Sequence, residues 1–228
     1  MSTIAANIST LESRIHAAAL AARRAPDSIG LLAVSKTKPA EAIREAFAAG
    51  LRDFGENYLQ EALGKQAELA DLPLCWHFIG PIQSNKTRAI AEHFAWVHSV
   101  DRLKIAQRLS EQRPESLDPL NICIQVNVSG EASKSGCTPQ DLPALAEAIA
   151  ALPRLKLRGL MAIPEPTDDT CAQHAAFATV RALQENLSLP LDTLSMGMSH
   201  DLEAAVVEGA TWVRIGTALF GARDYGQP

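Results

Sequence analysis

One lysine of this 228-residue chain directly follows a run of apolar residues that is typical of a buried strand. The run is Leu31-Leu32-Ala33-Val34-Ser35-Lys36. At the end of such a strand Lys36 would face a partly desolvated cavity, where the loss of water favours the neutral amine. The neutral amine is the form that reacts with an aldehyde to give a Schiff base. A lysine that extends its ammonium group into solvent is the commoner case at a strand end, and position alone does not separate the two.

Two segments further along the chain have residue types suited to binding an anion. The first is Ser195-Met196-Gly197-Met198-Ser199, where Ser199 is placed to cap the following helix and to offer its hydroxyl and backbone N–H groups. In the second, Arg214-Ile215-Gly216-Thr217, Gly216 lets the backbone come close to a ligand and Thr217 adds a hydroxyl. Serine-rich and glycine-rich turns begin many helices, but the pair of loops is more specific than either alone.

Arg214 comes near the end of the last apolar run, and a charged side chain inside a barrel is costly unless it meets a partner. Two roles fit its chemistry: it binds a phosphate group, or it faces the nitrogen of a pyridine ring. In the second role the arginine keeps its proton, so the ring nitrogen stays unprotonated and the ring is a weak electron sink. Such a cofactor would be poorly suited to reactions that need a long-lived carbanion.

Other polar clusters give weaker signals. His77 and the pair Asn85-Lys86 flank the end of another apolar run, where structural and functional roles fit equally well. Lys134, in the loop Ser133-Lys134-Ser135-Gly136, fits either a ligand contact or a solvated surface residue. The six histidines show none of the spacings of a metal site, so we predict no metal centre. The sequence also has no G-x-S-x-G nucleophile motif and no P-loop.

These residues lie at the ends of segments that alternate between two patterns. Short apolar runs typical of buried strands alternate with longer, alanine- and leucine-rich segments typical of helices. The predicted strands are 31–35, 53–55, 76–80, 96–99, 121–128, 157–163, 193–196 and 212–215, and the predicted helices include 39–49, 57–70, 103–111, 142–151 and 171–187. A further amphipathic helix is predicted over 4–24, before a break at Pro26 and Gly30.

About eight strand–helix units in a row predict a parallel sheet with helices on its outside. Because no composition change or long linker divides the chain, we predict an α/β fold with one (β/α)8 TIM barrel domain over 1–228, in which 1–29 add an N-terminal helix that packs on the barrel. An open doubly wound sheet is the alternative, weakened by the lack of a G-x-G-x-x-G motif after the first strand. In a barrel, Lys36 and the two anion-binding loops would meet at the C-terminal ends of the strands.

Composition and charge exclude some classes of partner. The formal charge of -5 provides no concentrated basic face for nucleic acid or for a membrane surface. The four cysteines include no C-x-x-C pair, and the chain shows neither a signal peptide nor an apolar stretch of transmembrane length. We therefore expect a cytoplasmic protein with reduced thiols.

Six motifs in order along the chain resemble those of the pyridoxal phosphate homeostasis protein family (the YggS/PROSC group), which is similar to the N-terminal barrel of alanine racemase. From roughly Leu31 to Tyr225 they are Ala33-Val34-Ser35-Lys36-Thr37, Phe54-Gly55-Glu56-Asn57-Tyr58, His77-Phe78-Ile79-Gly80 with Gln83-Ser84-Asn85-Lys86, Lys134-Ser135-Gly136, Ser195-Met196-Gly197-Met198-Ser199 with Asp201, and Arg214-Ile215-Gly216-Thr217. The resemblance implies a protein that binds pyridoxal 5′-phosphate (PLP) without a firmly assigned catalytic activity. It also implies a role in buffering or delivering PLP, which keeps vitamin B6 and amino-acid pools balanced.

The resemblance implies a role for each matching residue. Lys36 matches the lysine that holds PLP as a Schiff base, Arg214 matches the arginine at the pyridine nitrogen, and Asn57 lies near the cofactor. The matches to the phosphate loop are Ser199, Gly216 and Thr217, and we include Met196 among the cofactor contacts. Lys134 matches a lysine that makes a secondary contact with PLP. Relatives often end in a lysine, whereas this sequence ends Asp224-Tyr225-Gly226-Gln227-Pro228, so we do not expect a transfer step through a terminal lysine.

Three functions remain to be separated: a PLP carrier, a PLP-dependent amino-acid racemase, and an aldolase-like enzyme that uses a Schiff-base lysine without PLP. A racemase needs an acid or base on each face of the cofactor, and neither Tyr58 nor Tyr225 is an obvious second-face acid. Aldolase-like enzymes usually place their lysine on a later strand. We therefore expect a non-catalytic carrier with PLP-dependent apoenzymes as candidate receivers. Because no second domain follows the barrel in this sequence, we also expect a monomer.

Overall fold

The computed structural model describes residues 3–129 and 135–221. Its eight strands are β1 Gly30–Val34, β2 Asp53–Glu56, β3 Cys75–Phe78, β4 Trp96–Val100, β5 Leu120–Gln125, β6 Leu155–Met161, β7 Thr193–Ser195 and β8 Trp212–Ile215. Its helices are α1 Ile4–Ala21, α2 Ala40–Ala48, α3 Leu59–Glu68, α4 Thr87–His93, α5 Leu103–Gln112, α6 Leu142–Ala150, α7 Thr170–Glu185, α8 Leu202–Val207 and α9 Thr217–Phe220, with short 3-10 helices η1 Pro26–Ser28 and η2 Ser84–Lys86.

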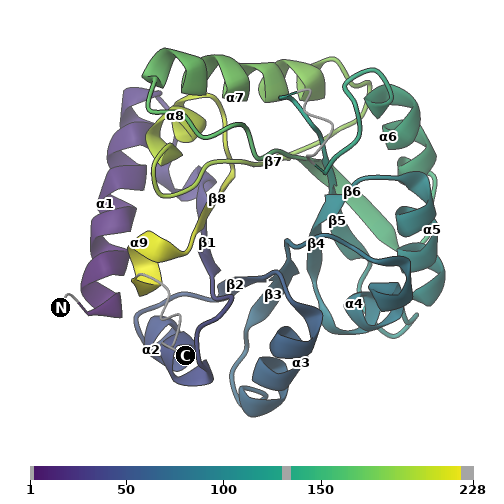
Figure 1. Cartoon of the computed structure of the whole chain (residues 1–228), viewed down its shortest axis with the longest axis horizontal. Helices are drawn as coiled ribbons and strands as arrows, with labels where there is room; N and C mark the ends of the chain where they lie inside the picture. The colour runs from purple at the N-terminus through teal and green to yellow at the C-terminus, as the bar shows by residue number, and fades with distance from the viewer. Residues whose placement is uncertain (1–2, 130–134, 222–228) are drawn as a thin grey trace, which may run out of the picture.

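The strands follow one another around a closed parallel barrel in chain order. Strand β8 pairs with β1 through contacts such as Leu32 with Arg214, which closes the ring. Figure 1 shows the helices arranged around the outside of this ring of strands. The predicted (β/α)8 barrel is therefore confirmed, and the alternative of an open doubly wound sheet is wrong.

Each predicted strand overlaps an observed strand, and the differences lie at the ends. The largest is at predicted strand 121–128, because β5 ends at Gln125 and Val126 forms only an isolated bridge with Cys137. The predicted helix 39–49 begins at Ala40, since Pro39 occupies its N-cap position. Within the described ranges, no helix combines the length and the apolar character needed to cross a bilayer.

The hydrophobic core lies mainly between the sheet and the surrounding helices. Leu11 of α1, Ile43 of α2 and Phe177 of α7 are each at most 2% exposed there. A separate apolar cluster of Trp96, Cys123 and Met161 is also buried. Several further buried side chains on the strands are polar, namely His77, His98, Ser195 and Arg214. Because an unpaired buried polar group is costly, these side chains have to satisfy one another.

Helix α1 lies beside the last units of the barrel, as Figure 1 shows. It ends at Ala21 rather than at the predicted residue 24, and Arg23 then adopts a left-handed conformation with a φ of 56°. The side-chain amide of Asn7 donates to the carbonyl of Leu219 in α9 at 2.8 Å. The N-terminal helix therefore helps to hold the short helix that follows β8.

Candidate functional site

A cavity of about 240 Å³ opens at the C-terminal ends of the strands. Its apolar wall includes Val34, Ile79 and Ile163. A neighbouring cavity of about 260 Å³ shares Ile79 and Ile163 with it and extends toward Gln125 and Ser135. This end of a (β/α)8 barrel is where the βα loops bring reactive groups together.

Most residues predicted to bind a cofactor line this cavity, namely Lys36, Asn57, Ser199, Arg214, Gly216 and Thr217. Met196 does not: it is 0% exposed in the core between the sheet and the helices, and Met198 lines the cavity instead. Side chains alternate along a strand, so when Ser195 points into the barrel the next residue points outward. Lys134 lies outside the described residues, and its contact with a cofactor stays a prediction.

The segment that carries Lys36 has a strained backbone. Thr37 has a φ of 64°, a left-handed conformation that β-branched residues rarely adopt. Its N–H group donates to Glu61 Oε1 at 2.5 Å, and on the other side of Lys36 the Ser35 hydroxyl donates to Glu56 Oε1 at 2.7 Å. Strain of this kind persists where the surroundings over-determine the backbone, and it is concentrated at functional sites. These flanking contacts fix the point at which Lys36 leaves β1.

A buried charged network lies behind this segment. The Lys65 ammonium group on α3 contacts Glu56 Oε1 at 2.8 Å and Glu61 Oε1 at 2.5 Å, and it donates to the Ser35 carbonyl at 2.7 Å. Burial raises the pKa of the Glu56 carboxyl, and hydrogen bonding to Lys65 opposes that shift. Glu56 and Glu61 accept from the two residues that flank Lys36. Because Lys65 bonds both of these carboxylates, the network ties α3 to the end of β1.

Asn57, directly after β2, brings a buried acceptor to the cavity. Its Oδ1 atom is buried and has no hydrogen-bond partner among the described residues. Gly80 packs against the same residue, because a Cβ atom there would lie 2.2 Å from the Asn57 carbonyl oxygen. A buried acceptor without a donor is unfavourable, so a ligand that offers a donor to Asn57 would be stabilised.

The loop after β7 depends on a glycine. Gly197 has a φ of 95°, and a Cβ atom there would lie 2.5 Å from the Ala205 Cβ. The predicted capping of α8 by Ser199 is wrong, because Asp201 occupies the N-cap position. The Asp201 carboxylate instead accepts from the Met198 N–H group at 2.6 Å and holds the loop. Ser199 remains in the cavity wall.

Arg214 presents a buried guanidinium group to the cavity and is 5% exposed. Its Nη1 donates to the carbonyl and to the hydroxyl of Ser195, the latter at 2.9 Å, and its Nη2 donates to the Ala162 carbonyl at 2.9 Å. Burial lowers the pKa of Arg214 to about 10, which leaves the group protonated at neutral pH. The site therefore holds a fixed cation that suits an acceptor or a negatively charged group of a ligand.

Two residues that support the site, Lys65 and His98, were not among the predicted site residues. Lys65 follows Glu61 by four residues on α3, and this spacing was a signal available in the sequence. His98 is fully buried, with Nδ1 at 2.7 Å from the Ser195 hydroxyl. No local pattern reveals that contact, since it joins β4 to β7.

The cavity thus combines an amine at the end of β1, a fixed guanidinium on β8, and hydroxyl and backbone groups of the loops after β7 and β8. An amine suits an aldehyde, while the guanidinium and hydroxyl groups suit a phosphate or a ring nitrogen. The apolar wall suits a small ring. These groups together fit a phosphorylated aromatic aldehyde.

Comparison with known proteins agrees with this geometry. Residues 2–224 match the family described as the N-terminal domain of alanine racemase. The chain is 79% identical over 228 residues to the pyridoxal phosphate homeostasis protein of Pseudomonas aeruginosa, covering 100% of this chain and 99% of the relative. It is 53% identical over 235 residues to the protein of the same name from Escherichia coli, covering 99% of each.

Solved structures give the same relationship. PipY of Synechococcus elongatus, solved with PLP bound, superposes with a TM-score of 0.85 at 44% identity, covering 96% of this chain and 100% of PipY. Alanine racemase of Corynebacterium glutamicum has a TM-score of 0.71 at 19% identity, covering 99% of this chain and 63% of the racemase, and shows a shared fold alone. By its sequence and its barrel, this chain belongs to the family of pyridoxal phosphate homeostasis proteins, whose fold is that of the alanine racemase N-terminal domain.

Proposed function

We propose that this chain binds pyridoxal 5′-phosphate between Lys36 and Arg214 and acts as a carrier that buffers or delivers it. The observation that carries the proposal is one cavity that pairs a strand-end lysine with a buried, hydrogen-bonded guanidinium group. The Oδ1 atom of Asn57 in the same wall has no partner in the described part of the chain, and it also calls for a donor from a ligand. The relatives named for PLP homeostasis, and PipY solved with PLP bound, support this assignment.

The residues of the cavity take complementary roles toward this ligand. PLP supplies an aldehyde, which condenses with a lysine amine to form a Schiff base and release one water molecule. Lys36 offers the amine, and the strained, hydrogen-bonded segment around it fixes the direction of attack. The phosphate is held by hydroxyl and backbone groups of Ser199, Gly216 and Thr217. Arg214 donates to the ring nitrogen and keeps it unprotonated, which disfavours carbanion chemistry.

The carrier role rests on what the cavity offers for proton transfer. A racemase needs an acid or base on each face of the ring and a site that excludes water. Among the described lining residues, His200 is the one side chain besides Lys36 able to act as both acid and base, and it is exposed. Tyr58 is 55% exposed at the N-cap of α3. A site open to solvent favours exchange of a bound ligand over stereochemical control.

Absorption spectroscopy of the PLP-loaded protein, followed by borohydride reduction and peptide mapping, tests the anchor. We expect a visible absorption band in the wild type, and reduction should attach PLP permanently to Lys36. Lys36→Ala should lack the band, while Lys38→Ala, a matched control in the same segment, should keep it. A wild type without the band, or a label on another lysine, would contradict the proposal.

Enantiomer conversion of alanine and serine separates a carrier from a racemase. The PLP-loaded protein should convert neither amino acid faster than free PLP does, and it should restore the activity of a PLP-dependent apoenzyme. Conversion that is lost in both Lys36→Ala and His200→Ala would establish the racemase and reject the carrier.

We further propose that the carrier works in the cytoplasm as a monomer. All four cysteines are free thiols, as is usual in a reducing compartment. Sedimentation of the loaded and unloaded protein at micromolar concentration should give the mass of one chain, and a stable dimer in either state would reject the monomer.

A further inference from the structure

Polar side chains form a continuous hydrogen-bonded path through the barrel, which we name the interior chain. Its members are Asp53 on β2, His77 on β3, His98 on β4, Ser195 on β7 and Arg214 on β8. The successive distances are 3.0 Å from Asp53 Oδ1 to His77 Nε2, 2.9 Å from His77 Nδ1 to His98 Nε2, 2.7 Å from His98 Nδ1 to Ser195 Oγ, and 2.9 Å from Ser195 Oγ to Arg214 Nη1. The Asp53 side chain is 30% exposed, whereas the other four residues are at most 5% exposed.

The two charged ends decide the direction of every hydrogen bond in the interior chain. The Asp53 carboxylate can only accept, so His77 must carry its proton on Nε2. Burial lowers the pKa of both histidines, so each ring is neutral and its second nitrogen accepts. His98 therefore carries its proton on Nε2 and accepts from the Ser195 hydroxyl at Nδ1. Because the Ser195 O–H group donates a hydrogen bond to His98, the Ser195 oxygen accepts from the Arg214 guanidinium group.

Aromatic neighbours hold the first ring of the interior chain in place. The His77 ring stacks on Trp96 with centroids 5.5 Å apart and an interplanar angle of 3°. Trp212 meets the same ring edge-on at 5.2 Å. Because ring reorientation would require these indoles to move, His77 keeps Nδ1 directed at His98.

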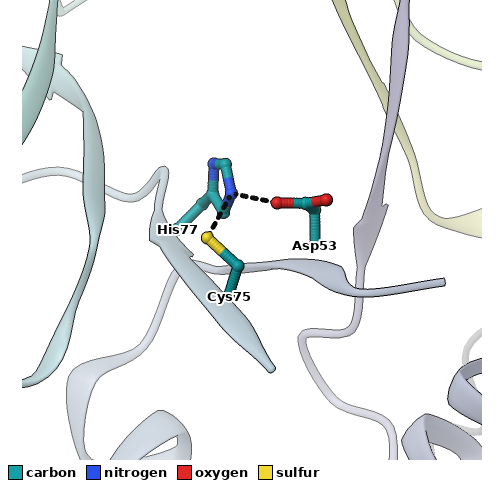
Figure 2. A group of neighbouring side chains, drawn as sticks. All are labelled: Asp53, Cys75 and His77. Atoms are coloured by element: carbon teal, nitrogen blue, oxygen red, sulfur yellow. Dashed lines mark hydrogen bonds and ion pairs between the residues drawn. The ribbon is translucent and has the colours of Figure 1, made fainter. Parts of the chain in front are cut away.

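The outer end of the interior chain could also be read as a metal site. Figure 2 shows Asp53 and Cys75 both in contact with the same His77 nitrogen, with Cys75 Sγ 3.4 Å from it. However, in the metal-free protein burial and the nearby Asp53 carboxylate raise the pKa of the Cys75 thiol to about 12, so the thiol keeps its proton beside His77. Asp53 is moreover already paired with the His77 N–H group. These contacts favour a hydrogen-bonded end over a metal centre.

We propose that His77 and His98 are positioning residues that act through Ser195 to hold the Arg214 guanidinium group in the ligand cavity. Their fixed tautomers leave Ser195 only an acceptor to offer Arg214, and Asp53 sets the direction of the whole path. The donors of Arg214 are thereby kept aimed, which suits a ligand that presents an acceptor. The role in ligand binding rests on the proposed PLP site, but the proton arrangement does not.

Nuclear magnetic resonance of ¹⁵N-labelled protein without PLP tests the proton arrangement by itself. Long-range ¹H–¹⁵N spectra at neutral pH should show His77 and His98 as neutral rings with the proton on Nε2. A proton on Nδ1 of either ring, or a doubly protonated ring, would overturn the inference. The same spectra recorded with added Zn²⁺ should be unchanged, and loss of the His77 Nε2 proton signal would establish the metal site instead.

Two amide variants at one position then test the link to the ligand. In His98→Asn the amide can take the place of Nδ1 and keep a partner for Ser195, whereas in His98→Gln it takes the place of Nε2 and Ser195 loses its acceptor. We expect PLP affinity about tenfold weaker in His98→Gln and within about threefold of wild type in His98→Asn. Thermal unfolding of both variants without PLP controls for damage to the fold.

The outcomes separate this inference from the proposed function. Equal loss of affinity in the two variants, in proportion to their lost stability, would mean a merely structural role and overturn the inference. If wild-type protein fails to bind PLP, the proposed function fails, while the proton arrangement is still decided by the spectra of the PLP-free protein.

Discussion

Two buried polar regions support residues of the cavity, one next to Lys36 and one next to Arg214, and they differ in how they avoid the cost of burial. Behind Lys36, the Lys65 ammonium is paired with the carboxylates of Glu56 and Glu61. Next to Arg214, two neutral histidines form consecutive hydrogen bonds that lead to Ser195. The first region balances charges, whereas the second avoids charge in its middle.

The difference follows from what each region holds. Next to Lys36 it holds a backbone segment, because Lys65 bonds the Ser35 carbonyl and Glu61 bonds the Thr37 N–H group. Next to Arg214 it holds a cation, and a further charge beside a buried guanidinium would be unfavourable if positive. Neutral rings with fixed tautomers direct Arg214 without adding charge. Loss of the first region should therefore cost stability, and loss of the second should cost ligand affinity.

The largest effect is expected from Lys65→Met, which leaves the Glu56 carboxylate buried without its cation. Removing one partner of a buried pair costs about 3–5 kcal/mol, and we expect a loss of that size in the free energy of unfolding by urea. Adding Glu56→Gln to the Lys65→Met protein should recover part of the loss. As a control, Arg44→Met breaks the exposed pair of Arg44 with Asp71 at 2.7 Å and should cost far less. Similar losses for the two variants would show that the Lys65 network is not the stabilising one.

Opposite dependences of stability on pH should distinguish the two regions. The pKa values of His77 and His98 are lowered by burial. Their contribution to the free energy of unfolding is therefore complete above the ordinary histidine pKa of about 6.5, and it is lost as the pH falls below that value. The pKa of Glu56 is raised by burial. Its contribution to the free energy of unfolding is therefore complete below the ordinary carboxyl pKa of about 4.5, and it is lost as the pH rises above that value. Each unit of pKa shift corresponds to about 1.4 kcal/mol.

Urea unfolding, measured at intervals of about one pH unit between pH 4 and pH 8, checks these two dependences of stability on pH. His98→Asn should flatten the fall in stability on the acidic side, and Glu56→Gln should remove the decline that accompanies rising pH. A His98→Asn protein with the acid sensitivity of the wild type would mean that His98 is not buried as a neutral ring.

A smaller effect, with opposite signs for stability and binding, is expected from Thr37→Gly. Glycine adopts a φ of 64° without the steric cost of a β-branched residue, so the free energy of unfolding should rise by about 0.5–1 kcal/mol. The segment of Lys36 becomes less constrained, so PLP affinity should fall. Arg23→Gly relieves a similar conformation, with a φ of 56°, outside the cavity and should change stability alone. Unchanged PLP affinity in Thr37→Gly would show that strain does not position Lys36.

The smallest effect is expected from Arg14→Gln on helix α1. Arg14 donates to the Ser199 carbonyl at 3.1 Å and pairs with Glu203 at 2.7 Å, with both side chains partly exposed. Stability should fall by less than about 1 kcal/mol, and phosphate affinity, measured by calorimetry, by no more than about threefold. Glu203→Gln keeps the bond to Ser199 and should leave phosphate affinity unchanged. A larger loss in Glu203→Gln would mean that the ion pair, rather than that bond, orders the loop.

Much of the cavity could be predicted because its main residues follow strands of simple apolar composition. Lys36 is separated from the apolar strand β1 by one residue, and Arg214 lies within β8, whose bounds were predicted as observed. The helix cap was harder, since both Ser199 and Asp201 are suitable residues close to the start of α8, and the Asp201 carboxylate bonds the Met198 N–H group. Met196 was expected at the cavity, but it directly follows β7, and one step along an extended segment changes which side of the sheet a residue faces.

The sequence by itself determined the order of βα units, the strand that carries Lys36, and the glycine- and hydroxyl-containing loops, because each depends on residues adjacent in the chain. Only the tertiary structure decided which polar residues meet inside the barrel. His98 and Ser195 are 97 positions apart, and Arg214 reaches Ser195 only because β7 and β8 are neighbours in the closed ring. Barrel closure turns alternate residues of distant strands toward one axis, and that convergence has no local pattern in the sequence.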